Sequence, residues 1–249
     1  MLEDDFNDVL GKAIRGLGKS ASELGVAESS LQRLLAGEMD QEVVRKIAPL
    51  LDLDAEKLIR LEHYTPTVAA PACLHTFVSS FGHLGVNAFI VETAEQLLVF
   101  DTGTDSEALL AFIAQYPDKQ TVLYITHDHP DHTAGIRQFK QLGVSVIMPE
   151  NARDQVFANF SMTCLNVDGH CSPATAYLLQ SEDLDQAICI VGDALFAGSI
   201  GGCKSKSAYE MALPKIRQNL LSLPAETILC SGHGPLTTVA QEIENNPFF

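Results

Sequence analysis

The stretch Tyr124-Ile-Thr-His-Asp-His-Pro-Asp-His-Thr-Ala-Gly135 decides the fold. A short apolar run over residues 121–125 is typical of a buried strand, and it stops at Thr126. Four potential metal ligands follow within six positions. Side chains so close together in sequence cannot all face one side of a helix, but they can converge from a tight loop at the carboxyl end of a strand. The loop therefore predicts two neighbouring metal positions. Its four potential ligands are His127, His129, Asp131 and His132.

Three further ligand candidates lie downstream, and each follows an apolar stretch that is typical of a strand. They are His170 after Gly169, Asp193 after Gly192, and His233 in Gly232-His-Gly-Pro235. A catalytic zinc site needs three or more protein ligands and keeps one position open for water. The loop and these downstream residues together offer enough side chains to meet that requirement.

These motifs, in this order, resemble the metallo-β-lactamase fold superfamily over residues 74–249. Within that superfamily, the run Gly192–Gly202 and the ending Asn246-Pro-Phe248 are most similar to the glyoxalase II-like hydrolases. The resemblance implies an α/β fold, the αββα sandwich, with ligands on loops at one edge of the sheets. Outside the motifs, we expect a helix or loop over residues 151–160 and a long helix over residues 207–221.

The resemblance also implies two divalent metal ions, each held by three side chains and both contacted by a bridging aspartate. The implied ligands are His127, His129 and His170 for one ion, Asp131, His132 and His233 for the other, and Asp193 as the bridge. Histidine and carboxylate ligands suit zinc, iron and manganese alike, so the identity of the metal stays open.

Asp101, in Val99-Phe-Asp-Thr-Gly103, matches the first motif of the family. The resemblance implies that it orients the metal ligands from behind, as metal sites generally require. The sequence alone also allows Asp101 to cap a helix expected over residues 104–114. Both roles are compatible with each other.

The chemistry that the resemblance implies is hydrolysis by a metal-bridging hydroxide. Two cations about 3.5–4 Å apart lower the pKa of a shared water toward about 7, and they polarise a substrate carbonyl. Asp193 would fix the separation of the ions, and Asp131 would shuttle a proton to the leaving group. The expected substrate is a small molecule, a thioester or a related activated ester, as for a hydroxyacylglutathione hydrolase.

Departures from the glyoxalase II pattern leave the substrate itself open. Glyoxalase II proper has an additional C-terminal helical region that helps to bind glutathione, and this sequence stops at Phe249. Gly202 stands where many relatives have arginine, so glutathione recognition does not follow. Substrate contacts are instead predicted at four other residues. They are Lys204, Lys206 and Tyr209, close to Gly202, and His83, in a loop between strands that would overhang the metals.

Two alternative functions fit parts of the same pattern. Persulfide dioxygenases resemble this sequence in the same motifs, but they use one iron held by two histidines and a carboxylate. Relatives can keep Asp131, His132 and His233 without a second ion, so these residues permit two metals without requiring them. The other alternative is a transcription regulator that uses the metal domain as a sensor.

That second alternative arises from residues 1–64, where apolar residues recur at helical spacing without any strand pattern. We expect five short helices, the second opened by a capping box at Ser20 and Glu23 and the last two capped by Asp40 and Asp54. The middle of this region resembles the helix-turn-helix of phage-repressor-like DNA-binding domains. The predicted organisation is a small helical domain over residues 1–64, a linker over 65–73 and a hydrolase domain over 74–249.

The charge of the chain argues against nucleic acid as its partner. The net charge is −16, and the helix expected over residues 28–36 offers only Arg33 as a cation, whereas phosphate contacts need clustered Lys and Arg. The helical domain is therefore expected to pack, to form a homodimer or to cover the substrate. The acidic amino terminus lacks the pattern of a signal peptide, and no apolar run approaches the ~20 residues that span a bilayer. We expect a cytoplasmic protein with six reduced cysteines.

Overall fold

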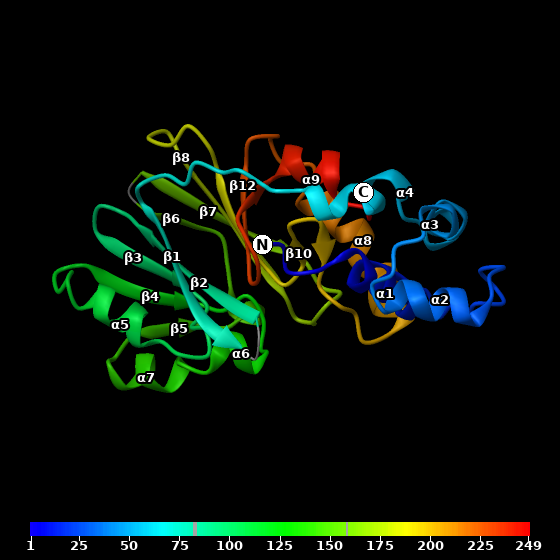
Figure 1. Ribbon diagram of the computed structural model, residues 1–249. Coiled ribbons are helices and arrows are strands. Elements are labelled where there is room, and N and C mark those ends of the chain that lie inside the picture. The colour runs from blue at the N-terminus through cyan, green and yellow to red at the C-terminus, as the bar shows by residue number, and fades with distance from the viewer. Residues whose placement is uncertain (82–83, 158) are drawn as a thin grey trace.

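The computed structural model describes residues 1–81, 84–157 and 159–249 (Figure 1). Two β-sheets lie face to face in its larger part. The first sheet contains, in spatial order, β1 (Leu74–Phe81), β2 (Leu84–Glu92), β3 (Gln96–Phe100), β4 (Gln120–Tyr124) and β5 (Ser145–Ile147). The second contains β13 (Thr237–Thr238), β12 (Ile228–Ser231), β9 (Ile188–Gly192), β8 (Thr175–Ser181), β7 (Phe160–Asn166) and β6 (Gln155–Phe157). A small hairpin of β10 (Leu195–Phe196) and β11 (Ser199–Ile200) follows β9.

Helices cover the outer face of each sheet, as Figure 1 shows. The first sheet is covered by α5 (Glu107–Ile113) and α7 (Ile136–Gln141), through Leu109 and Phe139. The second is covered by α8 (Lys206–Asn219), whose buried side chains share a cluster with those of β8, β9 and β12. A separate apolar core, including Phe100 and Tyr177, fills the space between the sheets. The predicted αββα sandwich is therefore confirmed.

Parallel pairing places the ends of β3 and β4 at the same edge of the first sheet. Phe100 pairs with Tyr124, so Asp101 and the loop after Tyr124 leave the sheet side by side. In the second sheet, β9 and β12 are also parallel, and Gly192 is paired with Ser231. Asp193 and His233 follow those two residues closely in the chain. This arrangement carries side chains from both sheets to one edge of the sandwich.

Two local expectations about secondary structure are wrong. Residues 155–157 form β6 in place of the expected helix or loop, since they pair antiparallel with β7. The capping box at Ser20 and Glu23 forms, with the Ser20 amide donating to the Glu23 carboxylate at 2.9 Å. It opens a run of turns and no helix, because Gly25 follows at once with a φ of +65°.

The helices expected in the amino-terminal region are otherwise present. They are α1 (Phe6–Leu17), α2 (Glu28–Leu35), α3 (Gln41–Ile47), continued by η1 (Ala48–Leu51), and α4 (Ala55–Arg60), continued by η2 (Leu61–His63). Asp40 accepts a hydrogen bond from the amide of Val43 at 3.2 Å, and Asp54 accepts one from the amide of Lys57 at 3.0 Å. Both predicted helix caps are thus confirmed. The structure adds α9 (Val239–Asn245), which the sequence patterns did not predict.

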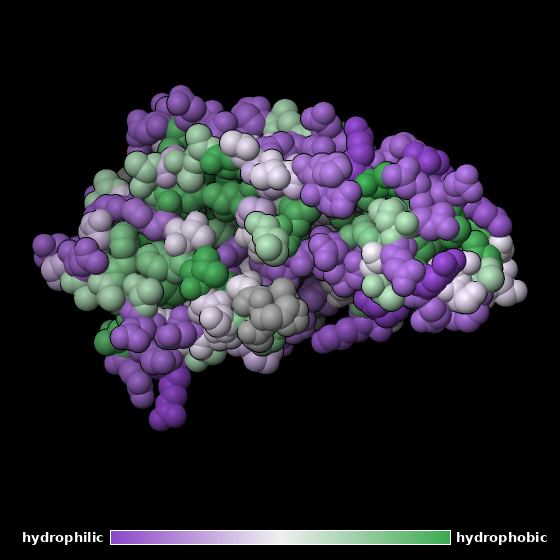
Figure 2. Space-filling model, viewed as in Figure 1, coloured by the Kyte–Doolittle hydropathy of each residue, from purple (hydrophilic) through white to green (hydrophobic). Residues whose placement is uncertain are grey.

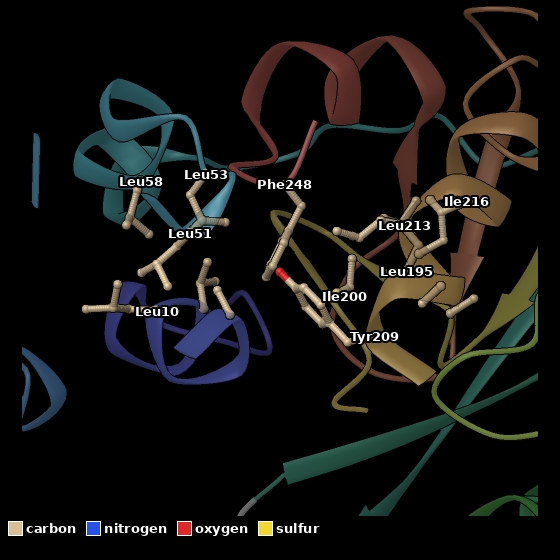
Figure 3. Close-up of a cluster of buried hydrophobic side chains, with 14 of the residues drawn as sticks. Leu10, Leu51, Leu53, Leu58, Leu195, Ile200, Tyr209, Leu213, Ile216 and Phe248 are labelled. Carbon is tan, nitrogen blue, oxygen red and sulfur yellow. The ribbon is translucent and has the colours of Figure 1, made fainter. Parts of the chain in front are cut away.

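The amino-terminal helices pack into the same apolar cluster as the outer face of the second sheet. Figure 3 shows Leu10 and Leu51 on one side of this cluster, Leu213 on the other, and Phe248 between them. In the view of Figure 2, hydrophilic residues cover much of the helical end of the molecule. Apolar side chains of the helices such as Val9, Leu34 and Ile47 are buried in this cluster. The helical region and the sandwich therefore share one core, while the domain boundaries at residues 64 and 74 stay predictions.

Gly16 of α1 provides a sharp test of this shared core. A Cβ atom there would lie 2.4 Å from the ring of Tyr209 in α8, so Gly16→Ala should force α1 and α8 apart. We expect a loss of about 1–3 kcal/mol in the free energy of unfolding, although alanine is the better helix former. Urea unfolding measures it.

The matched control for this prediction is Gly11→Ala in the same helix. A Cβ at Gly11 would meet the far end of the Arg15 side chain, which can move away. Its unfolding free energy should equal or exceed that of the parent. If Gly16→Ala were as stable as Gly11→Ala, the packing of α1 on α8 would be refuted.

None of the helices in the described part of the chain is both long and apolar enough to cross a membrane. All six cysteines are free thiols.

Candidate metal centre

The histidine-rich loop begins where β4 ends, at the carboxyl edge of the first sheet. His127 and His129 leave the strand on alternate positions, and α6 (Pro130–Thr133) then begins with a proline in its first turn. This short helix carries Asp131 and His132 into the interior, where both are at least 94 % buried. The loop thereby brings four potential ligand side chains together from six consecutive residues, 127–132.

The first group of donor atoms combines three histidine nitrogens with the carboxylate of Asp193. Nδ1 of His129 lies 3.0 Å from Nε2 of His127 and 3.0 Å from Nε2 of His170. Nitrogen ligands about 2.0–2.1 Å from a tetrahedral zinc lie about 3.3 Å apart, so this spacing is close to that of a metal site. Oδ2 of Asp193 lies 3.5 Å from the Nε2 of His170 and 3.9 Å from that of His127.

The second group lies directly beside the first. Oδ2 of Asp131 is 3.3 Å from Nε2 of His233 and 3.7 Å from Nε2 of His132. Asp193 also borders this group, with Oδ1 3.2 Å from Nε2 of His132 and Oδ2 3.5 Å from Nε2 of His233. The structure thus brings together all of the predicted ligands in two groups, and within each group the donor atoms lie within 4.8 Å of one another. Asp193 adjoins both groups.

The opposite nitrogen of each of three rings faces an oxygen acceptor. Nδ1 of His170 donates to the carbonyl of Gly202 at 2.7 Å, and Nδ1 of His233 donates to the carbonyl of Gly85 at 2.8 Å. Nδ1 of His132 lies 2.9 Å from Oδ2 of Asp101. A proton on Nδ1 leaves the lone pair of Nε2 directed into the centre, which is the form that binds a metal.

Asp101 connects the two parallel strands behind the ligands. Its carboxylate accepts hydrogen bonds from the amide of Thr126 at 2.8 Å and from the Thr126 hydroxyl at 2.7 Å, as well as facing His132. Its φ of 59° lies in the left-handed region, which residues other than glycine seldom adopt. The helix-capping role does not hold, because α5 begins later, after Ser106. Asp101 is thus placed to orient the loop and one of its histidines.

Two buried atoms at the centre lack the partners that buried polar atoms normally have. Nε2 of His132 and Oδ1 of Asp193 lie 3.2 Å apart, but they do not form a hydrogen bond with each other or with any other group of the described chain. Gly232 leaves space beside them, since a Cβ there would lie 2.2 Å from Oδ1 of Asp193 and 2.6 Å from Cε1 of His132. Orphaned donor atoms, a glycine cradle and a set of histidine and carboxylate ligands all fit divalent cations.

The pKa values of several candidate ligands are shifted by burial and by their charged neighbours. Burial lowers the pKa of His127 to about 3, so that ring is neutral and ready to bind. Burial alone would also lower the pKa of His233, but hydrogen bonds to Asp131 and Asp193 outweigh it and raise the value to about 10. Burial would raise the pKa of Asp193, but the adjacent His132 ring holds it well below its usual value. In the second group, protons therefore balance the carboxylates, and a bound cation would displace them.

Of the four residues predicted to contact the substrate, those that the structure describes lie in different environments. Nζ of Lys204 lies 3.5 Å from Nε2 of His129, at the exposed side of the first group. Lys206 is exposed on α8, where it pairs with Glu210 at 3.7 Å. Tyr209 is only 2 % exposed and packs against α1, so its position does not fit the predicted contact with a substrate. His83 lies outside the described residues.

Two glycines beside the ligands were not singled out by the sequence patterns. A Cβ at Gly201 would lie 1.8 Å from the backbone oxygen of Asp193 and 2.9 Å from the ring of His170, so only glycine fits there. Gly232 has the same role on the other side of Asp193. Their signal in the sequence was their place next to ligand motifs.

Comparison with known proteins agrees with this geometry. Residues 81–164 match the family model of the metallo-beta-lactamase superfamily. The chain is 26% identical over 201 residues to the probable metallo-hydrolase YqgX of Bacillus subtilis, covering 67% of this chain and 93% of that protein. It is 28% identical over 196 residues to the hydroxyacylglutathione hydrolase GloC of Haemophilus influenzae, covering 65% of this chain and 91% of that protein.

A solved structure shows the same likeness in three dimensions. TTHA1623, in a di-iron-bound form, superimposes with a TM-score of 0.53 and 26% sequence identity, covering 70% of this chain and 100% of that chain. The resemblance predicted from the motifs is therefore confirmed by sequence and by structure. Residues 81–164 are thus similar to the metallo-beta-lactamase superfamily in sequence, the sandwich around them shares its fold, and a small helical region precedes them.

Proposed function

We propose that this protein is a metal-dependent hydrolase of thioesters or related activated esters. The observation that carries the proposal is the convergence of seven donor side chains on two adjacent positions, with Asp193 next to both. The relatives named metallo-hydrolase and hydroxyacylglutathione hydrolase support hydrolysis, and the latter supports a thioester substrate. The di-iron form of TTHA1623 supports two metals.

The carboxylates at the centre have different roles in the proposed reaction. Two divalent cations, when bound, supply Lewis acidity and lower the pKa of a water toward about 7. Asp193 presents one carboxylate to both groups, which fixes their separation, and Asp101 holds His132 in a single orientation. Asp131 is the remaining carboxylate at the centre and can carry a proton to the leaving group.

The surroundings favour an anionic substrate group at the exposed side. Lys204 places its ammonium group next to His129, where it can attract a carboxylate or the departing thiolate.

Covalent catalysis by the neighbouring thiol, Cys171, is disfavoured, because burial raises the pKa of Cys171 and its Sγ donates to Asp128 at 3.2 Å. Attack by an activated water is therefore the reaction that these residues support best.

A substrate panel tests the proposal on the purified protein. Thioesters that differ in acyl group and in thiol, together with lactones, should be hydrolysed with release of one acid per turnover. A chelator should stop the reaction, and zinc, iron or manganese should restore it. Oxygen uptake on a persulfide, with no hydrolysis of any thioester or lactone, would reject the proposal in favour of the dioxygenase.

A further inference from the structure

The first residues of the chain reach the metal centre. Figure 1 places the amino terminus between the sandwich and the helical region. Oε1 of Glu3 lies 3.9 Å from Nδ1 of His233, and the Glu3 side chain is only 11% exposed. The backbone of this residue packs closely on the loop after the ligand, since a Cβ at Gly234 would lie 3.3 Å from the Glu3 nitrogen. A carboxylate from the amino-terminal segment, residues 1–5, therefore lies behind a metal ligand.

Helix α1 fixes this segment in place through Lys12. The ammonium group of Lys12 forms an ion pair with Asp4 and donates to the carbonyl of Ile200 in β11 at 2.8 Å. It also lies 5.0 Å above the ring of Phe196, whose own ring meets that of His233 edge-on at 5.7 Å. Asp4 and Lys12 are mostly buried, so this contact is well shielded from water. Because Asp4 already makes the ion pair that anchors the segment, the carboxylate of Glu3 is left to face His233.

The position of Glu3 resembles that of Asp101 on the other side of the centre. Asp101 faces Nδ1 of His132, and Glu3 faces Nδ1 of His233. A carboxylate behind a metal-binding imidazole orients the ring and makes its other nitrogen a stronger ligand. The carbonyl of Gly85 already accepts the Nδ1 proton of His233, so Glu3 adds negative charge beside that bond. His132 and His233 both belong to the second group of donors.

We propose that Glu3 is a positioning residue for His233 and sets the affinity of the second metal position. The amino-terminal region then contributes directly to metal binding: Glu3 faces the ligand His233, and the ion pair of Asp4 with Lys12 holds Glu3 in place. This inference rests on the proposed two-metal function. It assigns Glu3 no contact with the substrate, and its effect passes through the ligand that it faces.

Metal binding by the full chain tests the proposal without reference to turnover. The metal-free protein is titrated with zinc in competition with a chromophoric chelator, which resolves the first and second equivalents. Glu3→Gln keeps the size of the side chain and removes its charge. We expect the second equivalent to bind about 10–100-fold more weakly, and the first to bind as in the parent. Lys12→Met, which releases the segment, should weaken the same equivalent.

Two controls separate this effect from a change in folding or in overall charge. Glu38→Gln removes an exposed carboxylate from the same helical region and should leave both equivalents unchanged. Glu3→Asp keeps the charge and should bind the second equivalent more tightly than Glu3→Gln. Circular dichroism of each variant should match that of the parent.

The outcomes distinguish this inference from the proposed function. A parent that binds two equivalents, with Glu3→Gln binding both just as tightly, would overturn the role of Glu3 and leave the hydrolase intact. Equal weakening of both equivalents would also overturn it, because the effect would not be specific to His233. A parent that takes up a single equivalent would overturn the two-metal function, and this inference with it.

Discussion

Asp193→Asn should abolish hydrolysis while leaving the fold intact. Asp193 is the one predicted ligand whose oxygens approach both groups of donors, at 3.2 Å from His132 and 3.5 Å from His170. An asparagine has nearly the same shape but only one oxygen and no charge, and its amide nitrogen cannot bind a cation. Removal of a group that only supports a metal ligand typically lowers activity about 10–100-fold. The loss of activity in Asp193→Asn should be larger than that.

The measurement is thioester turnover of Asp193→Asn at equal protein concentration, with circular dichroism to check the fold. Asp128→Asn is the matched control, since Asp128 is an exposed carboxylate within the same loop as the ligands. It should retain the activity of the parent. Full activity in a folded Asp193→Asn variant would disprove the bridging role.

The second large effect is expected for His233→Ala, and it decides how many metals the reaction needs. His233 belongs to the second group alone, whereas His127, His129 and His170 form the first group with Asp193. The variant should keep one metal equivalent and lose most of the other. In a two-metal hydrolase, turnover should fall at least about 10–100-fold, whereas a one-iron dioxygenase should keep much of its activity.

Metal content and thioester hydrolysis of His233→Ala are compared with those of the parent, and oxygen uptake on a persulfide is followed in parallel. His63→Ala is a suitable control, because His63 is an exposed histidine far from the centre in sequence. A His233→Ala variant that hydrolysed thioesters as fast as the parent would show that the second position is not needed.

The convergence of the candidate metal ligands could be predicted from sequence because its signals are local. The candidate ligands come after the ends of strands, from Asp193 directly after β9 to His132 eight residues after β4, and parallel strands such as β3 and β4 bring their carboxyl ends to one edge. The two helix caps at Asp40 and Asp54 are local in the same sense, since each bonds an amide three residues ahead. Such features depend on residue type and spacing alone.

Features that depend on distant contacts could not be predicted in this way. Strand β6 is only three residues long, and only its pairing with β7 makes it a strand. Tyr209 stands near Lys204 and Lys206 in the sequence, but the space at Gly16 in α1 draws it into the core. Glu3 lies in an acidic terminus with no motif, and only the folded chain brings it to His233.

The most direct test of the account is the number of metal ions per chain in freshly purified protein, measured by elemental analysis beside thioester turnover in the same sample. The seven converging side chains predict two divalent ions per chain, and turnover that rises as the second position fills. A single iron per chain, with oxygen uptake on a persulfide and no hydrolysis of thioesters, would contradict it.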